Sequence, residues 1–143
     1  MSWMQKKRAI MMQAASPTPS NDIVPSSWHG GTISQSGLIN PNSTNGQYTD
    51  VLIPVPAGAT GVKRTGQASY DGTSISFFVH AYNANEAWQS PRSNSIGVGD
   101  TVALSTWTTR PTYIRIAFLF SAASGKSMTN DIRAACYGAE WVY

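Results

Sequence analysis

Alternating apolar and polar residues predict β-strands over most of the chain, and residues 112–120 give the clearest pattern. Every second residue there is large and apolar, so one face of the strand would carry Ile114, Ile116, Phe118 and Phe120. The opposite face is mixed and includes Tyr113 and Arg115. Pro111 precedes the segment and Ser121 to Gly125 follows it, as expected at strand ends. The pattern predicts an inner strand of a sandwich, with Tyr113 and Arg115 toward the outside or a groove.

Further strand patterns lie between residue 28 and the end of the chain. Residues 74–82 alternate in the same way and would place on one face Ile75, Phe77, Val79 and Ala81. Shorter strands are expected at 32–34, 48–55, 62–65, 101–104 and 131–143. Asn45-Gly46 and Asp71-Gly72 are typical of tight turns. With seven or eight strands and no helical pattern in this region, the prediction is an all-β protein: a two-sheet antiparallel sandwich, specifically a jelly roll.

The first residues differ from the rest. Residues 1–16 contain good helix formers without glycine or proline, and predict a short helix. Residues 17–27 contain Pro17, Pro19 and Pro25 and predict a semi-rigid linker, which leaves 28–143 as the β-sandwich domain. The apolar and basic side chains of residues 1–16 predict an anchor that contacts other proteins through Trp3, Met4, Lys6, Lys7, Arg8, Ile10 and Met11. The alternative is a disordered leader.

The charge distribution argues against a general nucleic-acid-binding protein. Lys6, Lys7 and Arg8 account for the formal net charge of +3, and the other seven basic residues are balanced by seven acidic ones. A neutral body offers no broad footprint for phosphates, so no specific nucleic acid is expected as a partner. No run of about 20 apolar residues is present, so no membrane span is expected.

No residue pattern identifies a catalytic centre. Cys136 is the only cysteine, so no intrachain disulfide can form, and its apolar neighbours predict a small core residue. Ser124-Gly-Lys-Ser127 resembles the end of a phosphate-binding loop but lacks its first glycine, because Phe120 occupies that position. His29 and His80 have no triad or zinc spacing around them. We therefore expect no enzyme activity, cofactor or metal site, although an aspartate near a turn could hold a structural calcium ion.

Aromatic residues in predicted loops are the remaining candidates for ligand binding. Trp88 and Trp107 lie in polar segments, where an indole ring can stack on a sugar. Nearby polar side chains that can bond to sugar hydroxyls are Arg92, Asn83, Asn85 and Gln89. The alternative for each tryptophan is burial at the end of the sandwich or in a subunit interface. Trp141 and Tyr143 are expected to pack against the body or a partner.

Four segments in order carry a family resemblance: Tyr48 to Thr60 with the sequence YTDVLIPVPAGAT, Val62 to Gly66 with VKRTG, Ile75 to Asn83 with ISFFVHAYN, and Tyr113 to Phe118 with YIRIAF. This order resembles small jelly-roll modules of bacteriophage tail, baseplate and fibre proteins, and is similar to carbohydrate-binding modules of the galactose-binding type. The resemblance covers about residues 30–120. It implies a structural protein on a virion surface, often a trimer, and the short chain lacks the long shaft of a complete receptor-binding fibre.

Three functions follow as hypotheses. The first is a non-enzymatic head-fibre, decoration or tail accessory protein that residues 1–16 attach to other virion proteins, as a homo-oligomer and preferably a trimer. The second is a free carbohydrate-binding module, and the two are compatible if the displayed domain contacts host-surface or mucus glycans. The third, a small hydrolase, has no support in the residues.

Overall fold

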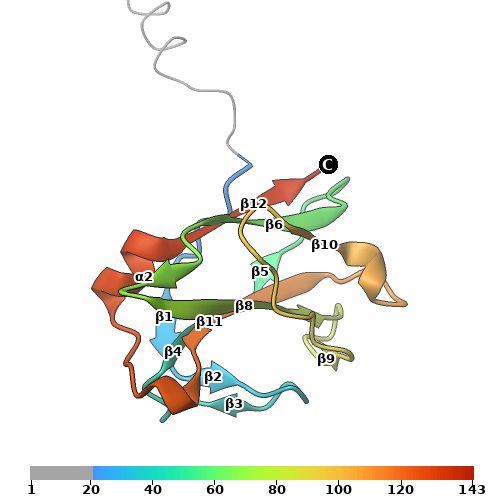
Figure 1. The fold of residues 1–143 in the computed structure, drawn as a ribbon. Coiled ribbons are helices and arrows are strands. Elements are labelled where there is room, and N and C mark those ends of the chain that lie inside the picture. Colours follow the sequence, from blue (N-terminus) through green and yellow to red (C-terminus); the bar gives the residue numbers. More distant parts are fainter. Residues whose placement is uncertain (1–20) are drawn as a thin grey trace, which may run out of the picture.

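A computed structural model describes residues 21–143. The predicted helical anchor at residues 1–16 and the first part of the predicted linker lie outside these residues. The same holds for the whole set of predicted anchor contacts: Trp3, Met4, Lys6, Lys7, Arg8, Ile10 and Met11. The described part is mostly β-structure in antiparallel sheets, as the sequence predicts (Figure 1).

The larger sheet has seven strands, and the two longest lie at its centre. In sequence order the strands are β1 (Trp28–Gly30), β4 (Gly46–Thr49), β5 (Ile53–Pro54), β7 (Ser69–Tyr70), β8 (Thr73–Tyr82), β9 (Trp88–Gln89) and β11 (Tyr113–Phe120). Their order across the sheet is β1-β4-β11-β8-β7, with β5 also paired to β11 and β9 to β8. The predicted inner position of the strand at 112–120 is therefore confirmed.

A second sheet of three strands packs against the first. Its strands are β6 (Gly61–Gly66), β10 (Thr101–Ala103) and β12 (Tyr137–Val142), in the order β10-β6-β12. A two-stranded hairpin, formed by β2 (Thr32–Ile33) and β3 (Ile39–Asn40), lies beside the larger sheet on the side away from the small sheet (Figure 1). The architecture is that of an all-β sandwich.

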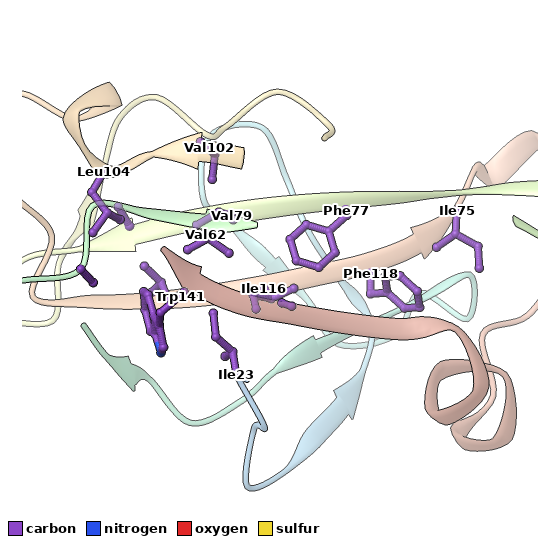
Figure 2. Packing of buried hydrophobic residues seen from close by; sticks show 14 of the residues in the cluster. Ile23, Val62, Ile75, Phe77, Val79, Val102, Leu104, Ile116, Phe118 and Trp141 are labelled. Atoms are coloured by element: carbon purple, nitrogen blue, oxygen red, sulfur yellow. The ribbon is translucent and has the colours of Figure 1, made fainter. Parts of the chain in front are cut away.

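The main core lies between the two sheets. From β8 and β11 it receives the alternating residues that the sequence predicts: Ile75, Phe77, Val79, Ala81, Ile114, Ile116, Phe118 and Phe120. Antiparallel pairing places Val79 opposite Ile116 and Phe77 opposite Phe118, so both strands turn their apolar faces the same way. Val62, Val102 and Trp141 close the core from the small sheet (Figure 2). Burial of these faces is the main force that holds the sheets together.

The first described residues belong to the small sheet and not to a linker. The Ile23 amide donates to the Ala139 carbonyl at 2.8 Å, and the Trp141 amide donates to the Asn21 carbonyl at 2.8 Å. The Ile23 side chain is 3% exposed within the main core. Residues 21–23 therefore pack with the domain that the sequence predicts to begin at residue 28. Two apolar residues between prolines, Ile23 and Val24, are too few to give a periodic signal.

The end of the chain is another correction, since residues 131–143 were predicted as one strand. Residues Asn130–Cys136 form an α-helix, α2, and only then does β12 begin. The Thr129 hydroxyl accepts a hydrogen bond from the Ile132 amide, and Asp131 lies in the first turn. Two short 3-10 helices, η1 (Leu104–Thr106) and η2 (Ala122–Ser124), complete the helical structure of the described residues.

The predicted strand 48–55 is interrupted. β4 ends at Thr49 and β5 begins at Ile53, yet both strands pair with β11. The Thr49 hydroxyl accepts the hydrogen bond of the Ile116 amide at 3.0 Å, so a side chain replaces a backbone acceptor at the break. The segment between the strands bulges outward, and Val51 is 55% exposed.

The two predicted turn dipeptides have different outcomes. Asp71 and Gly72 have positive φ angles of 48° and 75° and connect β7 to β8, which confirms the predicted hairpin turn. Gly46 instead begins β4, and a Cβ atom there would lie 2.7 Å from the Cβ of Leu119. A close approach of two strands, and not a tight turn, explains this glycine.

Candidate functional site

The side chains with the most unusual environments gather on the outer face of the large sheet, which is the face turned away from the small sheet. We define the outer cluster as Phe78, His80, Tyr82, Trp88, Arg92 and Arg115. Strand pairing places His80 of β8 opposite Arg115 of β11, and Tyr82 opposite Trp88 of β9. Because directly paired residues share a face, the sheet itself assembles most of this cluster.

His80 is the buried centre of the outer cluster and has 0% exposure. The Trp88 indole Nε1–H donates a hydrogen bond to His80 Nδ1 at 3.2 Å, so Nδ1 is the unprotonated nitrogen and Nε2 carries the proton. Burial, with smaller contributions from the positive charges of Arg92 and Arg115, lowers the pKa of His80 to about 3. The imidazole is therefore neutral at physiological pH.

Both arginines of the outer cluster lie over aromatic rings. The Arg92 guanidinium carbon is 3.8 Å from the centre of the Phe78 ring, and that of Arg115 is 5.0 Å from the centre of the Tyr82 ring. Arg115 also donates to the Asp50 carbonyl at 3.1 Å. Stacking of this kind orients a guanidinium while leaving its in-plane N–H groups available.

Trp88 is half-buried because the β2–β3 hairpin packs on its ring. A Cβ atom at Gly37 would lie 2.4 Å from the Trp88 Cδ2, and Gly37 has a positive φ of 85°. The glycine thus permits both the turn and close contact with one face of the indole. The Nε1–H edge is turned toward His80, and the partial exposure of the side chain leaves part of the ring for contact with another molecule.

The six ligand-binding residues predicted from the sequence do not all lie together in the structure. It brings Trp88 and Arg92 together in the outer cluster. Asn83 stabilises the β8–β9 turn, because its Oδ1 accepts hydrogen bonds from the backbone amides of Asn85 and Ala87. Asn85 is exposed at this turn, and Gln89 donates through Nε2 to the Thr109 carbonyl at 2.9 Å.

Trp107 is the clear correction within this set. Its side chain is 2% exposed and belongs to the main core, and its Nε1–H donates to the Pro91 carbonyl at 2.6 Å. No face of this ring is available for a sugar. The sequence pattern does not distinguish Trp107 from Trp88, because both lie in polar segments. Only the tertiary packing decides that the Trp107 ring is buried in the main core.

Sequence reasoning did not nominate Phe78, His80, Tyr82 or Arg115 as binding residues. The available signal was the alternation of strands 74–82 and 112–120, which places these residues on the faces opposite the core. What was missing was the pairing of these two strands with each other and with β9, which lies between residues far apart in the chain.

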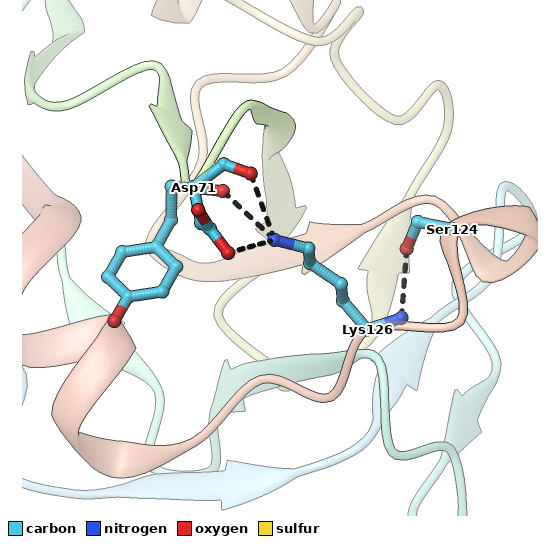
Figure 3. Close-up of polar contacts among 4 residues, drawn as sticks. Asp71, Ser124 and Lys126 are labelled. Atoms are coloured by element: carbon cyan, nitrogen blue, oxygen red, sulfur yellow. Dashed lines mark hydrogen bonds and ion pairs between the residues drawn. The ribbon is translucent and has the colours of Figure 1, made fainter.

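The loop around Lys126 has a structural role. Lys126 Nζ forms an ion pair with the Asp71 carboxylate at 3.4 Å and donates to the Asp71 carbonyl at 3.1 Å (Figure 3). The lysine of the segment that resembles a phosphate-binding loop thus ties this loop to the β7–β8 turn. The Ser124 hydroxyl accepts from the Lys126 amide within the loop.

Among residues 21–143, no group of three or more His, Cys, Asp or Glu side chains is arranged to hold a metal ion. No helix in the same range is long and apolar enough to cross a membrane. Comparison with protein-family models, curated proteins and solved structures finds no match to this chain. The fold and the cluster therefore define the chain only as an all-β sandwich protein with an aromatic and arginine-rich outer face.

Proposed function

We propose that the protein is a non-enzymatic structural component of a bacteriophage particle, in which residues 1–16 attach to other virion proteins and the β-sandwich is displayed. The observation that supports this proposal is the placement of the two functional ends. The described chain begins at Asn21 on the edge of β12 in the small sheet, whereas the outer cluster lies on the far face of the large sheet. A domain attached through its first residues would turn the outer cluster away from the attachment point.

The finer features of this proposal are a jelly-roll arrangement of the strands, a virion-surface location and a homotrimeric state. Two packed antiparallel sheets with the long β8 and β11 side by side support the jelly roll. The trimer is tested by light scattering of the full chain at micromolar concentration, where a monomer mass would remove it from the proposal.

Deletion of residues 1–16 tests the attachment. Cells that produce particles with the truncated chain should yield particles lacking it, while the purified truncated chain keeps the circular dichroism of a β-sheet protein. Arg92→Gln serves as the matched control, because it alters the displayed face and should be incorporated normally. Incorporation of the truncated chain at the level of the full chain would refute the anchor.

A second function, carbohydrate binding, is favoured by the outer cluster itself. A partly exposed indole beside two guanidinium groups combines a stacking surface with hydrogen-bond donors, which is what a sugar ring with polar substituents requires. This function is compatible with display on a particle, and it would also suit a free carbohydrate-binding module.

A further inference from the structure

We propose that the outer cluster binds an acidic saccharide, whose carboxylate or phosphate groups are held by Arg92 and Arg115 while one of its rings lies against Trp88. This inference deepens the carbohydrate-binding function and rests on it, but not on display on a particle. It names the class of ligand: sugars that carry a negative charge, as opposed to neutral ones.

The positive charges of Arg92 and Arg115 form no ion pair within the described residues. The ion pairs among residues 21–143 are Lys63 with Glu140 and Lys126 with Asp71, and neither involves an arginine of the cluster. Asp50 contacts Arg115 through its backbone carbonyl, and the Asp50 carboxylate accepts a hydrogen bond from the Ser27 hydroxyl. On a body that is neutral overall, the cluster is a local positive site.

One acidic residue in the β8–β9 turn would act against an anion. Glu86 is exposed and has a positive φ of 64°, which places it at the tip of the turn that precedes Trp88. It makes no ion pair with either arginine of the cluster in the described structure. Water and salt screen the charge of an exposed carboxylate, so its effect on the cluster is small. The two guanidinium charges therefore dominate the cluster.

Aromatic rings hold both arginines of the cluster in a fixed orientation, and most of the guanidinium N–H groups have no hydrogen-bond partner in the described part of the protein. Arg92 is stacked on Phe78 and has no hydrogen bond to a protein atom in residues 21–143, and Arg115 uses only one N–H on Asp50. A guanidinium has five N–H donors in a planar fork that matches a carboxylate or phosphate. Ring stacking fixes the plane in advance, which lowers the entropy lost on binding.

The two guanidinium groups lie along β8 at a spacing that one oligosaccharide can span. Arg92 lies over Phe78 and Arg115 lies over Tyr82, and these two rings are four residues apart, or about 13 Å along the strand. Both arginines also depress the pKa of the same imidazole, which requires that both charges lie near it. Two anionic substituents on neighbouring sugars of one saccharide therefore span the site.

Buried polar atoms without a hydrogen-bond partner are concentrated in the outer cluster. Five buried side-chain nitrogen or oxygen atoms in residues 21–143 make no hydrogen bond within the protein, and three of them, His80 Nε2, Tyr82 Oη and Arg115 Nε, belong to the outer cluster. Most buried polar atoms in proteins have a hydrogen-bond partner, so this concentration marks the outer cluster as the least satisfied part of the described structure. The three atoms are shielded from solvent, so the contacts with a ligand come from the remaining N–H groups of the partly exposed arginines and from the Trp88 ring.

Isothermal titration of the full chain tests the inference with matched pairs of probes. Trigalacturonate is compared with its methyl ester, which removes the charge and keeps the sugar, and phosphorylated pentamannose is compared with pentamannose. Arg92→Gln removes one guanidinium that makes no hydrogen bond to a described residue. Lys63→Gln is the control, because it removes the same charge from the small sheet.

The inference predicts that at least one acidic probe binds about tenfold or more tightly than its neutral partner. The pair that shows the difference identifies the group as carboxylate or phosphate. Arg92→Gln should weaken that binding about tenfold, while Lys63→Gln changes it less than about twofold. Higher salt should weaken it as well.

Three results would overturn the inference. Equal binding of acidic and neutral probes would refute the acidic class while leaving carbohydrate binding intact. Equal loss in Arg92→Gln and Lys63→Gln would show that net charge, and not the cluster, is responsible. Absence of binding by any probe at millimolar concentration, with folded protein, would refute both the inference and this carbohydrate function; the attachment experiment on particles would be unaffected.

Discussion

Replacement of His80 by glutamine isolates the energetic cost of keeping a neutral histidine in the outer cluster. Glutamine does not titrate, and its carbonyl can accept the Trp88 hydrogen bond that His80 Nδ1 accepts. In the folded protein the pKa of His80 is lowered to about 3, against an ordinary value of 6.5. Between these values the unfolded chain binds a proton that the folded chain excludes, so stability falls as the pH is lowered from 6.5 toward 3.

The size of this effect follows from the two pKa values. Each unit of difference corresponds to about 1.4 kcal/mol, so His80 alone should cost the wild type about 2 kcal/mol of unfolding free energy between pH 7.5 and pH 5. The loss continues as the pH falls further. Protonation of carboxylates also affects stability in acid, but it affects wild type and variant alike and cancels in their difference.

Urea denaturation at pH 7.5, 6 and 5 provides the measurement, with the midpoint and slope fitted at each pH. The wild type should lose about 2 kcal/mol more than His80→Gln over this range. His29→Gln is the matched control, since it removes the exposed histidine and should leave the acid loss in place. Identical pH dependence of wild type and His80→Gln, or an NMR titration of the His80 ring near pH 6.5, would refute the reasoning.

Three further predictions concern the sandwich itself. Phe118→Ala removes a fully buried ring between the sheets and should lower the unfolding free energy by about 3–5 kcal/mol, measured by urea denaturation; a loss under 1 kcal/mol would contradict the assigned core. Gly66→Ala should cost about 2 kcal/mol or more, because φ is 84° and a Cβ would lie 2.3 Å from the Cys136 carbonyl oxygen. Gly72→Ala, where φ is 75° but space is open, is its control and should cost about 1 kcal/mol. The Cys136 thiol is buried, which raises its pKa, so it should react with a thiol reagent only in denaturant; rapid reaction of the native protein would place it at the surface.

The two central strands could be predicted from the sequence because each carries its own complete signal. In both β8 and β11, four apolar residues recur at every second position, and the structure buries all of them to 3% exposure or less. The turn at Asp71-Gly72 was equally local, since its positive φ angles depend on those two residues. Such features need no information from the rest of the chain.

Other elements depended on contacts that the local pattern does not contain. Helix α2 is only seven residues long, too short for a periodic pattern to outweigh the apolar run that leads into β12. The break between β4 and β5 arises because a threonine hydroxyl takes over one bond of the ladder with β11. Ile23 joins the core through pairing of residues 21–23 with β12, at the other end of the described chain.

The candidate site shows the same division between local and long-range information. By itself, the sequence determined which residues face away from the core on each long strand, that the body beyond the first residues is electrically neutral, and that Trp88 and Arg92 were worth attention. Only the tertiary structure decided that Trp107 is in the core and that Arg115 lies opposite His80, 35 positions away in the chain. The physical reason is that strand register is set by the burial of the whole core, so a residue's neighbour across the sheet is determined by the sum of distant contacts and not by the residues beside it.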